Sequence, residues 1–267
     1  MIVAVYRVLY GEDFIVESIQ SILEHVDRIV VVIAPRPWGS SKGVSFHGVW
    51  RPWPQQFDDL QGMVTRNFRN VLIVEDFYPT PFSQHDHIVQ NVLTPRGLLP
   101  ADVVFIEPDH VFVDAEAGAT FARWRASDSR AGATSQVELW APPGYKPVWR
   151  VPERAGRSSV LFYRSIAPGS KLPPIPPVEI VGEVHNLGFC FSAETMLWKH
   201  LTAMAYSKEI GDCMPNPDWY DGKWLSWHPE TNNANLEITA TLEHLIPRVV
   251  PYDAYLLPES IRRRYGL

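Results

Sequence analysis

The stretch MIVAVYRVLYGEDFIVESIQSILEHVDRIVVVI, residues 1–33, decides the expected fold. Two β-rich runs bound it, IVAVY at 2–6 and RIVVVI at 28–33, and the second has the unbroken apolar character of a strand buried on both faces. The segment between them opens with acidic residues and then repeats apolar residues at three- and four-residue spacing, which predicts a helix over about 12–26. The chain therefore begins with a strand, a helix and a strand.

The same alternation continues outward along the first half of the chain. Further strands and helices are expected at 70–77, 83–93, 101–106 and 114–125. Strands that alternate with helices indicate an α/β fold, with a mostly parallel central sheet covered by helices on both faces. Residues 34–57 are rich in proline, glycine and tryptophan, and we expect them to form a long loop.

The pattern changes in the second half, where proline-rich turns separate short strand-like runs. Strands are expected at 134–140 and 159–165, an extended segment at 171–180, and a helix from 192 to about 206. We therefore expect a single domain in two parts. Residues 1–125 form its α/β half, and a smaller region, 126–267, completes it.

Composition limits the classes of function that the chain can have. Apolar residues make up 46% of the sequence and charged residues 20%, as in an ordinary soluble protein, and the net charge of −6 provides no overall basic field for nucleic acid or anionic lipid. Cys190 and Cys213 have neither a metal-type spacing nor a disulfide framework, which suits reduced thiols. No run reaches the roughly 18 apolar residues of a membrane span, and the N-terminus lacks the parts of a signal peptide. We expect a cytoplasmic protein without a transmembrane segment.

A polar motif follows the expected strand at 101–106. Residues 105–112 read FIEPDHVF, so Glu107, Pro108 and Asp109 come directly after a buried run. In parallel sheets, ligands bind beyond the carboxyl ends of the strands. Two carboxylates separated by one residue can both approach one divalent cation, and oxygen ligands suit Mg²⁺ or Mn²⁺, whose remaining positions substrate phosphates fill. The alternative is a solvated turn, in which proline and aspartate are common.

With this motif in place, the chain resembles the nucleotide-sugar-dependent glycosyltransferases of the GT-A (Rossmann-like) fold, especially those of family 2. That family has an Arg-Asn-Glu-like turn after its first strand, and Arg7 and Glu12 match it, although the asparagine is missing. The family also has an Arg-Asn pair in the helix before its acidic motif. Gln90 and Asn91 stand there, so the arginine is missing.

The acidic motif and a later stretch extend this resemblance. The family's Asp-x-Asp motif corresponds to Glu107 and Asp109, with glutamate in place of the first aspartate. In some members a later histidine completes the metal shell, and a serine and a lysine approach the diphosphate. The matching residues are His185, Ser192 and Lys199. A neutral imidazole suits Mn²⁺, and a helix that begins at Ser192 is an anion site. A structural histidine and a plain helix cap are the alternatives.

The resemblance implies transfer of a sugar from a nucleoside diphosphate, which we expect to be UDP, to an acceptor hydroxyl. It assigns nucleotide-sugar binding to residues 1–125 and the acceptor side to 126–267. Mn²⁺ or Mg²⁺ would neutralise the leaving diphosphate. An inverting enzyme also needs a carboxylate base, for which Glu183 and Glu138 are the candidates. Glu138 is alternatively an exposed strand residue and Glu183 a hydrogen-bond acceptor beside the later histidine, and a retaining enzyme needs neither as base.

Other candidates concern the nucleoside and the acceptor. Asp76, after the third strand, can contact the nucleoside or simply end a strand in solvent. The stretch DWYDGKW supplies Trp219, Tyr220 and Trp224, whose rings suit packing on a sugar but also suit a core. The acceptor stays open between a glycan, a lipid-linked glycan, a small molecule and a hydroxymethylated DNA base. The last would need a basic surface, and the arginines at 150–164 and 262–264 are alternatively a solvated face.

Three rival classes of protein share some of these features. A sugar nucleotidyltransferase uses a similar sheet, but it has a glycine-rich phosphate loop after the first strand, where this chain has Gly11 alone. A metal-dependent hydrolase built on His110, His185 and the carboxylates would cleave phosphoesters without a donor. A non-catalytic carbohydrate-binding or interaction protein with a degenerate fold would account for the missing asparagine and arginine.

Overall fold

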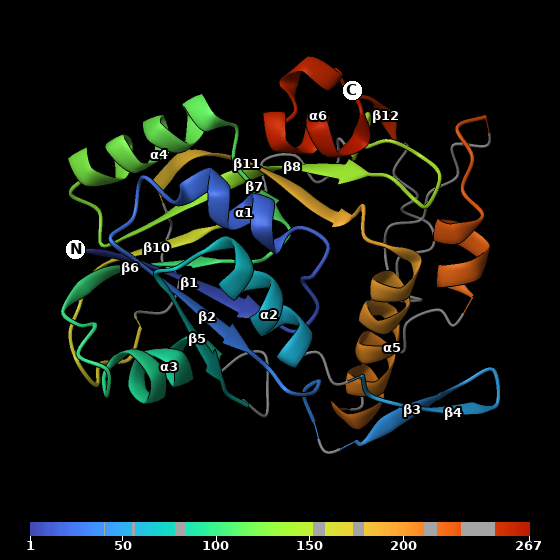
Figure 1. The fold of residues 1–267 in the computed structure, drawn as a ribbon, viewed down its shortest axis with the longest axis horizontal. Helices are drawn as coiled ribbons and strands as arrows, with labels where there is room; N and C mark the ends of the chain where they lie inside the picture. Colours follow the sequence, from blue (N-terminus) through green and yellow to red (C-terminus); the bar gives the residue numbers. More distant parts are fainter. Residues whose placement is uncertain are drawn as a thin grey trace.

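The computed structural model describes residues 1–39, 41–54, 57–77, 84–151, 158–172, 179–210, 218–230 and 249–267 (Figure 1). The expectations for Cys213, for the start of the helix at 83 and for most of the extended segment 171–180 lie outside these residues. Within the described residues, no helix combines the length and the apolar character that crossing a membrane requires.

The α/β fold with a central parallel sheet is confirmed. β1 (Ile2–Val8) pairs in parallel with β2 (Arg28–Ile33) on one side and with β6 (Ala101–Ile106) on the other, and β5 (Val71–Glu75) pairs in parallel with β2. The chain thus builds outward from β1 to β5 and then returns to β6. A sheet whose strand order reverses in this way opens a crevice at the carboxyl ends of the two strands, here β1 and β6.

Side-chain alternation along the buried strands explains why helices cover both faces of the sheet. The even-numbered residues of β1 pack in one core with α1 (Ile15–Ile22), α2 (Phe57–Asn67) and α4 (Asp114–Ala126). The odd-numbered Val3 and Val5 face the other core, with α3 (Gln84–Ile88) and the π-helical turn η2 (Val89–Leu93). Figure 1 shows α1 and α4 on the side of the sheet opposite α3.

The second half of the chain extends the same sheet with mixed pairing. β10 (Leu161–Ile166) runs antiparallel to β6 and β8 (Ala131–Trp140), and β11 (Glu179–Phe189) pairs in parallel with β8 and antiparallel with the short β7 (His110–Val111). The short strands β9 (Trp149–Arg150) and β12 (Val250–Pro251) close this edge. β7 follows β6 directly, so the motif between them lies where the two halves of the sheet meet.

An aromatic core holds the last part of the chain against this edge. α5 (Ala193–Ile210) follows β11, and the π-helical segment η4 (Tyr220–Leu225), the 3₁₀ turn η6 (Ala254–Leu256) and α6 (Glu259–Tyr265) come after it. Trp140, Trp219 and Trp224 are fully buried there, together with Phe189 and Ile261. α5 therefore stands on a packed base with its side facing the ends of β1 and β6.

Two elements were not expected from the sequence. β3 (Gly43–Phe46) and β4 (Val49–Pro52) form a hairpin within the stretch expected to be a loop, and α2 follows it. The two-residue turn of the hairpin, His47 and Gly48, has positive φ at both positions, as a type I′ turn requires. The usual signal of this turn is Asn-Gly or Asp-Gly, and His-Gly stands here instead, so the sequence gives little sign of the turn.

Candidate active site at the ends of β1 and β6

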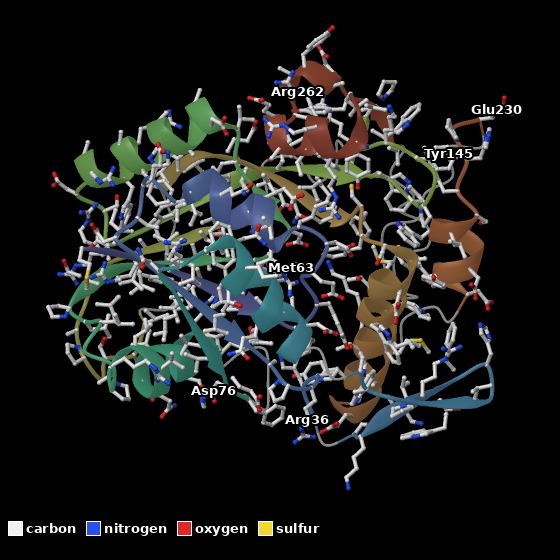
Figure 2. All side chains as sticks on the ribbon, viewed as in Figure 1. Arg36, Met63, Asp76, Tyr145, Glu230 and Arg262 are labelled. Carbon is white, nitrogen blue, oxygen red and sulfur yellow. The ribbon has the colours of Figure 1, made fainter. Side chains whose placement is uncertain are left out.

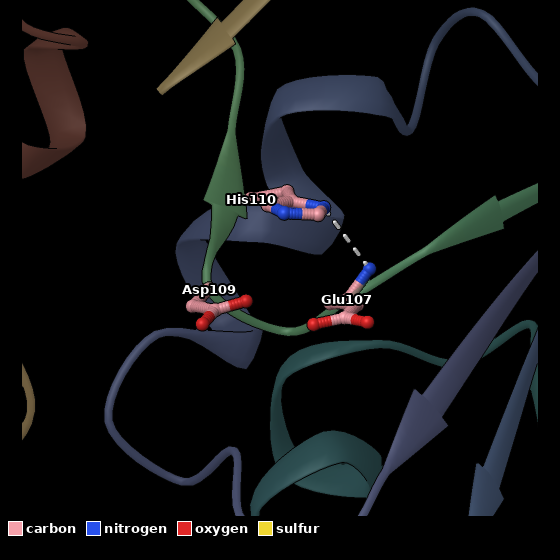
Figure 3. A group of neighbouring side chains, drawn as sticks. All are labelled: Glu107, Asp109 and His110. Atoms are coloured by element: carbon pink, nitrogen blue, oxygen red, sulfur yellow. Dashed lines mark hydrogen bonds between the residues drawn. The ribbon is translucent and has the colours of Figure 1, made fainter. Parts of the chain in front are cut away.

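The acidic motif forms a tight turn between β6 and β7. The backbone N–H of His110 donates to the carbonyl of Glu107 at 3.0 Å, and the N–H of Glu107 donates back to Nδ1 of His110 at 3.3 Å. Figure 3 shows both carboxylates at this turn and the imidazole above it. Pro108 lies so close to Gly11 that a Cβ on the glycine would approach the proline ring to 2.7 Å. The turn is thus held from both sides.

Arg7, at the end of β1, binds both the carboxylate of Glu107 and the side chain of Gln84 on α3. Its guanidinium donates to Glu107 Oε1 at 2.5 Å and to Gln84 Oε1 at 2.9 Å. Burial of the site opposes ionisation of Glu107, but nearby positive groups together, Arg7 first and then His110 and Lys199, outweigh that effect and hold the pKa of this carboxyl below its ordinary value. Glu107 is therefore a carboxylate at neutral pH. Its side chain is still half exposed, so it can take a further ligand.

The second carboxylate is the more deeply placed of the two. Asp109 is 3% exposed, and its Oδ2 lies 3.5 Å from Nζ of Lys199 on α5. The same ammonium group donates to the carbonyl of Gly188 at 3.4 Å and lies over the ring of Phe191. The other oxygen, Oδ1, is buried and has no hydrogen-bond partner among the described residues. A buried carboxylate oxygen without a partner is costly unless something else satisfies it.

These side chains line one cavity of about 270 Å³ in the crevice where the strand order reverses. Arg7, Glu107, Asp109 and Lys199 all contribute to its wall. The rest of the wall is mainly apolar and aromatic, and it includes Tyr10, Trp38, Phe191 and Thr202. Such a wall, with few convergent charged groups, is typical of a ligand site.

The carboxylates suit a divalent cation. Among the described residues, Glu107, Asp109 and His110 form a group whose ligand atoms lie within 4.8 Å of one another. The unpartnered oxygen of Asp109 supports metal binding independently, because a cation would complete its interactions. Carboxylate oxygens favour Mg²⁺ or Mn²⁺. The residues therefore fit a divalent cation.

A neutral imidazole lies close to this charged group. His85 stacks on Phe105 with ring centroids 4.1 Å apart. Burial, together with the nearby Arg7, lowers the pKa of His85 to about 3. The ring therefore adds no positive charge beside the arginine, and Arg7 and Lys199 supply the cationic groups of the cavity wall.

His185, expected at the metal, does not join this group. Successive residues of a strand point to opposite faces, and the neighbouring Asn186 faces His110. His185 instead places Nε2 2.9 Å from the hydroxyl of Tyr252, and burial lowers its pKa to about 4. The imidazole near the carboxylates is that of His110, which directly follows them in the sequence.

Glu12 and Ser192 lie near each other but outside the cavity wall. Each is hydrogen-bonded to the residue next to, or close to, the other one. Ser192 donates to Asp13 Oδ2 from both its backbone N–H (3.1 Å) and its hydroxyl (3.2 Å), and Thr195 donates to Glu12 Oε1 at 3.3 Å. The N-terminus of α5 is indeed an anion site, but the protein's own carboxylates occupy it. A diphosphate would have to displace them.

Neither expected catalytic base lines the cavity. Glu183 is exposed on β11, on the same face as His185, and it helps to raise the pKa of Tyr252. Glu138 is 3% exposed and accepts a hydrogen bond from Gln136 at 2.9 Å. The expected alternative for Glu138, an exposed strand residue, therefore does not hold, because both faces of β8 are covered at this point.

The expected nucleoside contacts also lie outside the cavity wall. Asp76, beyond the end of β5, accepts from its own loop and lies 2.9 Å from Nε2 of His87 (Figure 2). Asn91 lies beside the other nitrogen of that ring, and Gln90 sits in the same π-helical turn. The residue of α3 that lines the cavity is Gln84, which the sequence analysis did not predict. The only available sign was its place at the start of the helix, nearest the strand ends.

The aromatic residues expected to bind an acceptor belong to the core. Trp219 and Trp224 are fully buried, and Tyr220 is 7% exposed. Trp224 donates to the carbonyl of Phe189, and the hydroxyl of Tyr220 donates to the carbonyl of Ala193. These rings anchor α5 and do not offer a face to a sugar.

Comparison with known proteins adds fold-level likeness alone. No family model and no curated protein matches the sequence. Among solved structures, a 4-diphosphocytidyl-2C-methyl-D-erythritol synthase is 15% identical with a TM-score of 0.37, over 61% of this chain and 74% of that one. Glucosyl-3-phosphoglycerate synthase from Mycobacterium tuberculosis, in complex with Mn²⁺, UDP and phosphoglyceric acid, is 14% identical (TM-score 0.31; 52% of this chain, 43% of that one). The inositol-1-phosphate CTP transferase from T. maritima is 11% identical (TM-score 0.31; 61% and 70%). Likeness at this level supports no statement about activity.

Proposed function

We propose that this protein is a divalent-metal-dependent glycosyltransferase that moves a sugar from a nucleoside-diphosphate sugar to an acceptor hydroxyl. One observation carries the proposal. The buried Asp109, which lines the cavity at the reversal point of the sheet, has an oxygen without a partner among the described residues and lies beside a second carboxylate and two cations. The resemblance of the sequence to family 2 glycosyltransferases supports the same activity.

The charges of the cavity favour a ligand that arrives with a metal ion. Glu107 and Asp109 are paired with Arg7 and Lys199, so the four charges balance. A divalent cation would add two positive charges, and a diphosphate would match them. Arg7 offers a planar set of donors suited to phosphate oxygens, whereas Lys199 acts as a point charge. A neutral sugar alone would leave this balance unmet.

Each residue then has a role in binding. Glu107 and Asp109 would hold the cation, which as a Lewis acid would stabilise the charge of the departing diphosphate. Arg7 holds Glu107 in place through its 2.5 Å contact and is itself held by Gln84. Lys199 lies beside Asp109 on the cavity wall, and Trp38 and Tyr10 offer an aromatic wall to the nucleoside or the sugar. We give Glu138 and Glu183 no catalytic role, because neither lines the cavity.

The proposal is tested by asking which product the purified chain releases. UDP-, GDP- and TDP-linked sugars are incubated with Mn²⁺, Mg²⁺ or a chelator, and slow hydrolysis of the donor is followed as release of the nucleoside diphosphate. We expect release from UDP-sugars that requires the metal and that D109N abolishes. The matched control is D59N, which changes an exposed aspartate on α2 and should behave as wild type.

The same assay separates the rival enzymes. A nucleotidyltransferase would release pyrophosphate from a nucleoside triphosphate and a sugar phosphate. A hydrolase would cleave a simple phosphoester such as p-nitrophenyl phosphate. Either activity without release of nucleoside diphosphate from any donor would contradict the proposal.

A further inference from the structure

His110 belongs by distance to the group that can hold a metal, and this raises the question of its role. We propose that His110 is not a ligand but a positioning residue, which together with Asn186 fixes the carboxylates of the acidic turn and the backbone beside Lys199. The inference rests on the proposed metal site, but it concerns residues to which that proposal assigns no role.

The ring nitrogen nearest the acidic turn is already used. Nδ1 of His110 accepts the backbone N–H of Glu107 at 3.3 Å, across the turn that carries both carboxylates. A neutral imidazole has one nitrogen with a free lone pair, and that lone pair also serves as the metal-binding position. Because the Glu107 amide points at it, a metal would have to displace this hydrogen bond. The contact instead closes the turn around Pro108.

The other ring nitrogen anchors the imidazole to the sheet. Nε2 lies 2.8 Å from the hydroxyl of Ser159. Nδ2 of Asn186 packs beside the ring, 3.3 Å from Nε2, without a hydrogen bond, because both groups are donors when Nδ1 accepts. With Nδ1 accepting, the ring proton is on Nε2 and is donated to the serine hydroxyl. His110 is 4% exposed. The ring is thus oriented from both ends, as expected of a group that transmits position.

Asn186 packs beside this ring and holds the backbone of β11 next to Lys199. Its Nδ2 donates to Oε1 of Gln136 at 3.2 Å, and its Oδ1 accepts the N–H of Gly188 at 2.8 Å. Gln136 in turn donates to Glu138, so a chain of hydrogen bonds runs from Gly188 through Asn186 into β8. Buried polar chains of this kind hold a single geometry because each broken contact leaves a group unsatisfied.

Gly188 is where this chain of contacts meets the charged groups. It lies in an irregular stretch of β11, between Asn186 and Phe189, where the register with β8 shifts. Its carbonyl accepts from Lys199, and a Cβ at this position would lie 3.0 Å from Asp109 Oδ2 and 3.1 Å from Lys199 Nζ. Asn186 therefore sets the backbone that fixes the distance between the lysine and the aspartate.

The test uses Mn²⁺ alone, without donor or acceptor, and pulsed electron paramagnetic resonance of the bound ion. If His110 is a positioning residue, wild-type protein binds Mn²⁺ without the ¹⁴N coupling of a directly bound imidazole. A strong ¹⁴N coupling that disappears in H110N would overturn the inference. This measurement does not depend on turnover. It tells whether the imidazole of His110 is bound directly to the metal ion.

Two variants divide the functions of the ring. H110N keeps an acceptor where Nδ1 lies, and it should bind Mn²⁺ within about threefold of wild type. H110Q keeps a polar group where Nε2 lies but loses the bond from Glu107, and it should bind about 10- to 100-fold more weakly, as partners of metal ligands typically do on mutation. Equal affinity in H110Q and wild type would also overturn the inference.

Asn186, on β11 beside Lys199, gives an independent check. N186A removes the contacts to Gly188, Gln136 and His110, and we expect a tenfold or greater loss of Mn²⁺ affinity. The matched control is N67A at the exposed end of α2, which should leave the affinity unchanged. Mn²⁺ binding that follows these expectations in a protein that turns over no donor would contradict glycosyl transfer and leave the positioning role intact.

Discussion

Two clusters of charged side chains lie close together in this molecule, and the sequence suggests the same ligand for both. One surrounds the cavity at the ends of β1 and β6, where Glu107 and Asp109 face Arg7 and Lys199. The other joins Glu12 and Asp13, in the loop after β1, to the N-terminus of α5. Both contain carboxylates beside hydrogen-bond donors, and both include residues that the sequence predicted to bind the sugar donor or its metal.

The clusters differ in whether a carboxylate oxygen remains available to bind a ligand. At the N-terminus of α5, Asp13 accepts two hydrogen bonds from Ser192, so the helix end is capped from within the chain. At the cavity, Asp109 keeps a buried oxygen without a partner, next to a hollow of about 270 Å³. A residue type and a place in the fold are therefore not enough to indicate a site. The useful sign is unsatisfied bonding capacity on a residue that lines a cavity.

The largest expected effect comes from removing that capacity at Asp109. D109N keeps the shape of the side chain but not its charge, so we expect metal-dependent release of the nucleoside diphosphate to fall by more than about 100-fold, the most that loss of an outer partner costs. The melting temperature should change little, because Oδ1 has no partner among the described residues and the amide oxygen can still accept from Lys199 at the Oδ2 position. Activity and thermal unfolding of the same preparation check both parts. A D109N protein with a lower melting temperature but unchanged metal-dependent activity would show instead that Asp109 has a structural role and does not bind the ligand.

His185 is a residue whose hydrogen bond, to Tyr252, is made within the protein and not to a ligand. Because its pKa is lowered to about 4 from an ordinary 6.5, the unfolded chain binds more protons than the folded one between these values. The free energy of unfolding should thus fall as pH falls from 6.5 to 4, by up to about 3 kcal/mol from this residue, and change little from it above 6.5. H185Q, which can still bond to Tyr252, should show a flatter pH profile in urea unfolding. Loss of Mn²⁺ affinity in H185Q at pH 7.5 would instead return this residue to the metal.

Gly188 tests how tightly the cavity cluster is packed. A Cβ there would approach Asn186 Oδ1 to 2.8 Å and also crowd Asp109 and Lys199, so G188A should cost about 1–3 kcal/mol of stability and weaken Mn²⁺ binding. Denaturant unfolding and calorimetric titration measure the two effects. G222A is the control, because its added Cβ would come no closer than 3.9 Å to Asp218 and should be close to neutral.

The smallest expected effect separates the two clusters most simply. S192A removes a cap of α5, because the serine hydroxyl accepts the N–H of Thr195, and the cost should be about 1 kcal/mol of stability. Its affinity for UDP in the presence of Mn²⁺ should equal that of wild type. If S192A binds UDP more than about tenfold more weakly while its stability is unchanged, the α5 cluster belongs to the donor site after all.

Sequence patterns predicted the part of the fold that depends on local chemistry. The runs at 2–6, 28–33 and 101–106 are apolar enough that only a buried sheet accommodates them, and the acidic turn after the last run follows from their parallel arrangement. Arg7 and Lys199 also reach the cavity that contains this turn. Both were predicted from the resemblance of the sequence to a glycosyltransferase family.

The remaining features depend on partners distant in the chain. The pairing of Asp13 with Ser192 joins residues 179 positions apart, so nothing near either of them shows that the helix end is occupied. Trp219 and Trp224 look alike in sequence whether they bind a sugar or fill a core, and only packing against Phe189 distinguishes the two. His185 and His110 lie on adjacent paired strands, and a difference of one residue in register decides which imidazole is near the carboxylates.

The central claim is that a metal ion and a nucleoside diphosphate bind at Glu107 and Asp109. Crystals grown with Mn²⁺ and UDP and measured at a wavelength where manganese scatters anomalously test it directly. The account predicts one anomalous peak bonded to Asp109 Oδ1 and a Glu107 oxygen, with the diphosphate between the ion and Lys199. A peak at His185, or a diphosphate at the N-terminus of α5 with no ion at Asp109, would contradict it.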